Sequence, residues 1–185
     1  MNPKSLYRII IGLGNPGDAY APTYHNVGSA FVLYLKQKDA ASEWRDSKLF
    51  QSASCRAVTL VLPKTFMNES GKAVTATLQK FRVQPKDILV VHDDHDLKVG
   101  SYKIAEPGTG SAGHNGVQSI IDAIGNTFPR LRIGISKTPD GPSRMKAENV
   151  VLSKITNADQ KILNEVFKKI LTENSITNCG YPSDR

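Results

Sequence analysis

A run of apolar β-branched residues that stops in a glycine-rich turn constrains how this chain begins to fold. The run Ile9–Ile11 leads directly into the segment GLGNPG at residues 12–17. Such a run is typical of a buried strand, and a glycine-rich turn after a strand leaves backbone N–H groups open to a ligand. Because His25 follows eight residues after Gly17, we expect its imidazole to return beside the turn.

The same glycines also fit the G-x-G-x-x-G pattern of dinucleotide-binding proteins. In those proteins the helix begins at the third glycine, but here Pro22 would remove a backbone donor from that helix. Asp39 stands near the place of the acidic ribose contact, yet it ends a helical pattern rather than a second strand. A dinucleotide-binding enzyme therefore remains an alternative, and it predicts cofactor binding.

Hydrophobic periodicity alternates between strand and helix along the chain, which is typical of an α/β protein. The predicted strands are residues 7–12, 50–54, 56–62, 87–92, 101–105 and 131–136. The predicted helices are residues 26–38, 70–81, 114–124 and a last amphipathic helix for which Asn157 and Gln160 provide the cap. The loops at 107–113 and 138–143 are rich in glycine, proline, serine and threonine, and we expect them to be mobile.

Length and composition limit the class of protein. With 185 residues and 39% hydrophobic content, one domain spanning residues 1–185 is expected. The net charge of +7 favours a polyanionic partner. Cys55 and Cys179 lie far apart without metal-ligand spacing, which argues against a disulfide framework or a zinc site. No segment has the pattern of a signal peptide or a membrane span, so we expect a cytoplasmic protein with no membrane partner.

Polar residues gather where predicted strands end, which is where open α/β sheets place their ligands. Asn15 and His25 follow the first strand. The later clusters are Phe66-Met67-Asn68, the run from His92 to Asp96, and Gly113-His114-Asn115-Gly116. We therefore expect these four groups to meet in one site.

Taken together, these segments resemble the bacterial-type peptidyl-tRNA hydrolase family from the first strand to the last helix. The matching segments are GLGNPGDAY and HNVG within residues 12–28, KTFMNESGKAV at 64–74, VVHDDHDL at 90–97, GHNG at 113–116 and RLRIGI at 130–135. The resemblance implies hydrolysis of the ester between a peptide and the 3′ end of tRNA. It also implies a single α/β domain, with a twisted, mixed but largely parallel sheet between helices, that acts as a monomer with no metal, organic cofactor or obligate protein partner.

The residue types indicate how such an ester could be cleaved. His25, largely neutral at cytoplasmic pH, is the candidate base that takes a proton from water. Asp93, carried over from the family motif, would orient His25, and the amides of Asn68 and Asn115 would stabilise the developing oxyanion. Asn15 would position His25 or the terminal nucleotide. Substrate contacts are also expected from Tyr20, Phe66, Met67, Gly113 and His114, while Asn68 and Asn115 could instead cap helices.

Binding of many tRNAs requires contacts to shared features such as phosphates. Arg132 stands at the family's phosphate-contact position, and alternation along the strand places Arg130 on the same face. Lys103 is the nearest available partner, because the clamp lysine of the family aligns with Ala105.

Two further departures and two alternatives stay open. Tyr24 replaces the arginine that usually precedes the histidine, and Asp94 and His95 replace a glutamate and an apolar residue. The run from His92 to Asp96 has metal-binding residue types, but alternation along a continuing strand would keep neighbouring side chains apart. The main functional alternative is a non-catalytic RNA-binding protein of the same fold.

Overall fold

The structure, a computed structural model, describes residues 7–38, 41–55, 57–137, 149–173 and 176. Its strands are β1 (Ile9–Gly12), β2 (Arg45–Asp46), β3 (Phe50–Cys55), β4 (Val58–Pro63), β5 (Ile88–Lys98), β6 (Tyr102–Ala105) and β7 (Arg130–Ser136). Within this part of the chain they form one sheet in the order β2-β3-β4-β1-β5-β7-β6. The central strands β4, β1, β5 and β7 pair in parallel, whereas β2, β3 and β6 add antiparallel edges. This confirms the predicted mixed sheet with a parallel centre.

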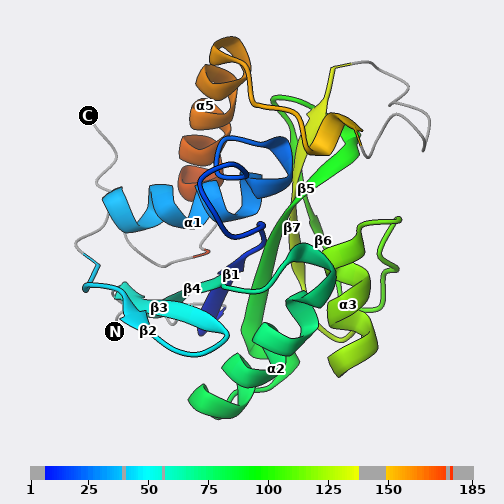
Figure 1. The fold of residues 1–185 in the computed structure, drawn as a ribbon. Helices are drawn as coiled ribbons and strands as arrows, with labels where there is room; N and C mark the ends of the chain where they lie inside the picture. Colours follow the sequence, from blue (N-terminus) through cyan, green and yellow to red (C-terminus); the bar gives the residue numbers. More distant parts are fainter. Residues whose placement is uncertain (1–6, 39–40, 56, 138–148, 174–175, 177–185) are drawn as a thin grey trace.

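Helices cover both faces of the sheet (Figure 1). Helices α1 (Val27–Lys38) and α5 (Asn157–Glu173) lie on one face, and α2 (Ser70–Phe81) and α3 (Asn115–Ile124) lie on the other. Alternation along β1 serves both layers, because Ile10 packs toward α1 and α5 while Ile9 and Ile11 pack toward α2 and α3. No helix among the described residues has the length and apolarity needed to cross a bilayer.

Two glycines let α1 approach the sheet closely. A Cβ on Gly12 would lie 2.4 Å from the carbonyl oxygen of Gly28, and a Cβ on Gly28 would lie 2.2 Å from that of Val91. Both distances are far below van der Waals contact, so any side chain at either position would push the helix away. This close approach brings the turn before α1, which carries His25, against the end of β5.

A second close approach joins α2 to α3. A Cβ on Gly71 would lie 2.2 Å from the carbonyl oxygen of Ser119, and the Gly71 N–H donates to Ser119 Oγ at 3.0 Å. At the same end of these helices, a Cβ on Gly116 would lie 2.4 Å from Met67 Sδ. The loop after β4 is therefore packed directly against the start of α3.

Most predicted elements are present within a few residues of their expected bounds, and the differences have physical causes. Strand β5 does not stop at His92 but continues to Lys98 because it pairs with β7 over most of that length. The two-residue strand β2 was not predicted, since only its pairing with β3 defines it. Residue 56, the expected start of the β4 strand, and the loop at 138–143 lie outside the described residues.

The cap of α5 differs from the prediction. Thr156, not Asn157, precedes the helix, and its hydroxyl accepts a hydrogen bond from the Asp159 N–H at 3.2 Å. The same hydroxyl donates to Asp159 Oδ2 at 2.8 Å. Threonine and aspartate three residues apart thus form the cap that the sequence analysis assigned to Asn157 and Gln160.

Candidate active site

His25 and Asp93 meet at the carboxyl end of the central strands. His25 lies in the 3-10 turn η1 (Tyr24–Asn26), and its Nδ1 is 2.9 Å from Oδ1 of Asp93 on β5. Because the carboxylate accepts, Nδ1 carries the hydrogen and Nε2 keeps its lone pair. Burial lowers the pKa of His25, but the charge of Asp93 and this hydrogen bond outweigh it, so the pKa lies above its ordinary value.

His114 binds the same carboxylate oxygen. Its Nε2 is 2.9 Å from Asp93 Oδ1, while its Nδ1 accepts the backbone N–H groups of Gly116 at 3.1 Å and Val117 at 3.2 Å. His114 therefore caps α3 and must carry its proton on Nε2. Burial raises the pKa of Asp93, but the two imidazoles lower it by more, so the carboxyl stays ionised. We call His25, Asp93 and His114 the Asp93 centre.

His92 contacts both Asp93 and His114 of this centre. Its Nδ1 is 2.6 Å from the carbonyl oxygen of Asp93, and its ring meets the His114 ring at 4.7 Å between centroids. Its Nε2 has no hydrogen-bond partner among the described residues. Complete burial holds the pKa of His92 well below its ordinary value, so this ring stays neutral.

Asn15 connects the first turn to the loop after β4. Its side-chain Oδ1 accepts the Met67 N–H at 2.8 Å, and its backbone N–H donates to Asn26 Oδ1, also at 2.8 Å. Asn26 returns a hydrogen bond from Nδ2 to the carbonyl oxygen of Asn15 at 2.9 Å. Asn26 is buried directly after His25, and the sequence analysis gave it no role.

Asn68 and Asn115 are exposed and do not cap the helices that follow them. Asn68 lies within the 3-10 turn η2 (Met67–Glu69), and Asn115 is the first residue of α3, whose cap is His114. The capping interpretation is therefore wrong for both residues. Asn68 lies on a turn that packs against α3, and Asn115 directly follows His114 of the Asp93 centre.

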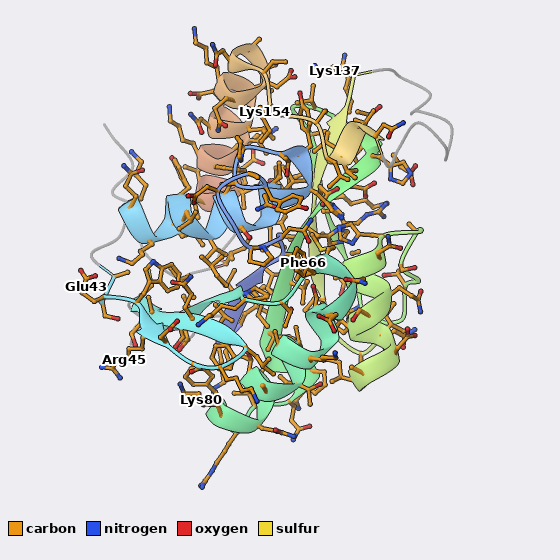
Figure 2. The ribbon with its side chains drawn as sticks, in the orientation of Figure 1. Glu43, Arg45, Phe66, Lys80, Lys137 and Lys154 are labelled. Atoms are coloured by element: carbon orange, nitrogen blue, oxygen red, sulfur yellow. The ribbon has the colours of Figure 1, made fainter. Side chains whose placement is uncertain are left out.

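The other expected substrate contacts adjoin these two asparagines in the chain or, for Tyr20, pair with Phe66. Tyr20 and Phe66 form an edge-to-face pair with ring centroids 6.3 Å apart, and Phe66 is 52% exposed (Figure 2). Met67 is buried against Gly116. Gly113 has a positive φ of 83°, which lets the loop turn sharply into the capping His114.

The predicted phosphate contacts lie on neighbouring strands. Arg132 on β7 is paired in register with Lys103 on β6, and its Nε donates to Oδ2 of Asp94. Lys103 is exposed, while the Arg132 side chain is 19% exposed. We call Lys103 and Arg132 the phosphate face.

Arg130 was expected on this face but is buried instead. It is 2% exposed, and its Nη2 donates to the carbonyl oxygens of Thr109 at 3.2 Å and Gly110 at 2.8 Å, as well as to Thr109 Oγ1. The arginine thus anchors the glycine-rich loop between β6 and α3. The expectation that Arg130 shares an exposed face with Arg132 is therefore wrong.

The side chains that follow His92 in the sequence lie closer together than predicted. Although β5 continues through it, the register with β7 is irregular between Asp94 and Lys98, and ligand atoms of Asp94, His95 and Asp96 lie within 4.8 Å of one another. The alternation argument against their convergence is therefore wrong. The residues of the Asp93 centre also converge this closely, but both of its imidazoles already direct an N–H to the carboxylate.

Tyr24 stands where the family that the sequence resembles usually has an arginine, and its side chain binds a carboxylate. Its hydroxyl donates to Oδ2 of Asp159, and Lys137 Nζ lies 3.0 Å from the same oxygen. Lys137 is also 5.6 Å from the centroid of the Tyr24 ring. Lys137, the residue that follows β7, thus places a cation beside both Tyr24 and Asp159.

Comparison with known proteins identifies the family. The family model described as peptidyl-tRNA hydrolase matches residues 9–178. The chain belongs to the peptidyl-tRNA hydrolase family. Peptidyl-tRNA hydrolase of Pseudothermotoga lettingae is 42% identical over 163 residues, covering 88% of this chain and 85% of that protein. The protein of that name from Pectobacterium atrosepticum is 42% identical over 170 residues, covering 88% and 85%.

Solved structures of peptidyl-tRNA hydrolases have the same fold as this chain. The crystal structure of peptidyl-tRNA hydrolase from Acinetobacter baumannii superposes with a TM-score of 0.82 and 33% identity, covering 92% of this chain and 88% of that one. A complex of peptidyl-tRNA hydrolase with N-propanol gives 0.83 and 32%, covering 95% and 91%. The likeness extends over the sheet and both helical layers.

Proposed function

We propose that this protein hydrolyses the ester between a peptide, or an N-blocked aminoacyl group, and the 3′ end of tRNA, with His25 as general base. Its family and its relatives at 41–42% identity support an enzyme of this class. The observation that carries the residue assignment is the bond between His25 Nδ1 and Asp93. That bond leaves Nε2 as the one basic atom of His25, with exposed amides on the flanking elements.

The first step is activation of water. Nε2 of His25 takes a proton while the water oxygen attacks the ester carbonyl carbon, and Asp93 stabilises the imidazolium that forms. A positioned base of this kind typically contributes about 10²–10⁴-fold in rate. His114 keeps the carboxylate in place because its own tautomer is fixed by the start of α3.

The second step is collapse of the tetrahedral intermediate. The amides of Asn68 and Asn115 donate to the oxyanion that formed when water attacked and the C–O π bond opened. When the carbonyl re-forms, the bond to the ribose 3′ oxygen breaks, and the imidazolium of His25 returns its proton to that oxygen. Water is consumed, and a free carboxylic acid and a 3′ hydroxyl are released.

Substrate recognition divides between the two ends of the ester. Tyr20, Phe66 and Met67 offer apolar surface beside the amides, and Gly113 with His114 forms the loop edge where the nucleotide enters. Asn15 holds Met67 in place because its Oδ1 accepts the backbone N–H of Met67. We assign the tRNA backbone to the phosphate face, where Lys103 supplies charge and Arg132 supplies directed N–H donors.

We further propose a single domain that acts in the cytoplasm as a monomer, with tRNA as its macromolecular partner. The chemistry of the two steps above needs no metal or organic cofactor. The wide separation of Cys55 and Cys179 in the sequence supports a reducing compartment. Light scattering of the purified protein would test the monomer, and a dimer would contradict it.

The test of this function is release of N-blocked aminoacyl groups from tRNA by the purified protein, with and without a chelator, beside the His25→Ala variant. We expect chelator-resistant cleavage by the wild type and a loss of about 10²–10⁴-fold in the variant, with tRNA still bound. The matched control is His95→Ala, which removes a histidine paired with Asp96 rather than with Asp93.

Each other outcome has a defined meaning. Wild-type protein that binds tRNA without cleaving it would establish the RNA-binding alternative. Cleavage that the chelator abolishes would establish a metal-dependent reaction. Equal loss of tRNA binding and cleavage in His25→Ala would make His25 a structural residue.

A further inference from the structure

The turn that carries His25 is bound to a segment more than a hundred residues further along the chain. The Tyr24 N–H donates to the carbonyl oxygen of Ser153 at 3.2 Å, and the Ile155 N–H donates to that of Pro22 at 2.8 Å. These bonds place the backbone on both sides of Thr23 against the segment that leads into α5.

Tyr24 extends this connection with its side chain. The residue is 1% exposed, and its hydroxyl donates to Asp159 Oδ2 in the first turn of α5. Thr156 Oγ1 donates to the same oxygen at 2.8 Å, and Lys137 Nζ lies 3.0 Å from it. Lys137 and Lys154, which belong to this region, are labelled in Figure 2. One carboxylate oxygen therefore receives donors from three separate parts of the described chain.

The charges in this cluster compensate each other. Burial raises the pKa of Asp159, but hydrogen bonds from Tyr24, Thr156 and Lys137 outweigh it, so the pKa lies below its ordinary value. The hydrogen bond to Asp159 also raises the pKa of Lys137. A carboxylate and an ammonium group thus remain ionised next to the Tyr24 hydroxyl at neutral pH.

Beyond the two backbone hydrogen bonds, the residues around His25 add little side-chain restraint on this side. The turn η1 precedes α1, and Thr23, at its N-cap, makes no side-chain cap; its hydroxyl donates instead to the Tyr20 carbonyl oxygen at 2.7 Å. Asn26 secures the opposite side through Asn15. On the side of the turn that faces α5, the side-chain contact is the one made by Tyr24.

We propose that Tyr24 is a positioning residue whose hydroxyl, held by Asp159 and Lys137, sets the placement of His25 against Asp93. The inference rests on the proposed role of His25 as base. Because Tyr24 is buried, it acts only through the geometry of its neighbour. A displacement of about 1 Å at a catalytic group can cost about 10²-fold in rate, and loss of one of several restraints costs a fraction of that.

The experiment compares Tyr24→Phe with Tyr102→Phe. Both remove a hydroxyl that binds a carboxylate on α5, but Tyr102 donates to Glu173 at 2.7 Å, far along the helix from the turn of His25. We expect Tyr24→Phe to lower kcat by about 3- to 10-fold with KM changed by less than about twofold. Tyr102→Phe should retain the wild-type kcat.

A second readout is independent of turnover. The pKa of His25, measured by NMR of labelled imidazole, should fall in Tyr24→Phe because contact with Asp93 is what raises it. Lys137→Met changes a half-exposed residue and tests the same cluster without altering the core. It should move kcat and the His25 pKa in the same directions by smaller amounts.

The outcomes separate this inference from the proposed function. An unchanged His25 pKa and kcat in both Tyr24→Phe and Lys137→Met would overturn the positioning role. So would a loss of kcat that follows only a lower melting temperature, with the His25 pKa unmoved. Suppose instead that the His25 pKa falls in Tyr24→Phe and Lys137→Met, while kcat stays at the wild-type value in both and also in His25→Ala. Positioning is then supported, and the role of His25 as base is wrong.

Discussion

The Asp93 centre and the phosphate face lie on neighbouring strands of the sheet but are built in different ways. At the centre, one carboxylate oxygen binds two imidazoles, and each imidazole is fixed by its own position in η1 or α3. On the phosphate face, Arg132 is directed by Asp94, and Lys103 extends into solvent. The first region is pre-organised, and the second offers charge with little fixed geometry.

This difference indicates which step each region governs. A pre-organised centre pays its ordering cost during folding, so changes there should appear in kcat. An exposed charged surface serves a polyanion through counterion release, so changes there should appear in affinity and in its salt dependence. The same contrast orders the expected effects of substitution.

The largest effect is expected from Asp93→Asn. The amide keeps the shape but removes the charge that stabilises the imidazolium, so kcat should fall by about 10²–10⁴-fold. Since Asp93 is also what raises the pKa of His25, while burial lowers it, the acid limb of the rate profile should move to lower pH. Measurement of kcat/KM against pH checks both effects.

The control for this charge removal is Asp122→Asn, a surface carboxylate on α3 that accepts from Gln118. It should leave the profile unchanged. An acid limb that stays at the same pH in Asp93→Asn would mean that His25 is not the group that titrates.

A smaller effect is expected from Asn115→Ala. Loss of one oxyanion donor typically costs about 10²–10³-fold in kcat, with little change in KM because the oxyanion forms only in the transition state. Steady-state kinetics checks this, with Asn164→Ala on the surface of α5 as the matched control. A rise in KM at constant kcat would show that Asn115 contacts the bound substrate instead.

The smallest effect is expected from Arg132→Ala. Removal of one phosphate contact should weaken tRNA binding several-fold and reduce the slope of log K against log salt by about 0.7–0.9. Titration of tRNA at several salt concentrations checks this. Arg45→Ala, on β2 at the opposite edge of the sheet, is the control. An unaltered slope in Arg132→Ala would remove this residue from the phosphate face.

Local pattern predicted most of the fold, and pairing between distant residues accounts for what it missed. The helix at Ser70–Phe81 begins and ends as its periodicity indicates. By contrast, the extension of β5 through residues with low strand propensity depends on β7. No signal within a short window reports that partner.

The same limit applies to the site. The motif segments predicted that His25 and Asp93 would meet, because strand ends converge on one edge of the sheet, and their side chains are 2.9 Å apart. They did not show that Arg130 would be buried on loop carbonyl groups, or that Tyr24 would find Asp159. Side-chain alternation gives the face of a residue but not its partner, and for Tyr24 and Asp159 the partners are 135 positions apart.

The central claim is that His25 carries its proton on Nδ1 and keeps Nε2 free as a base. Nitrogen-15 NMR of the labelled imidazole above its pKa measures this directly. We predict a protonated Nδ1 and an unprotonated Nε2 in the wild type. A protonated Nε2 at the same pH would leave no base facing the ester and would contradict the proposed mechanism.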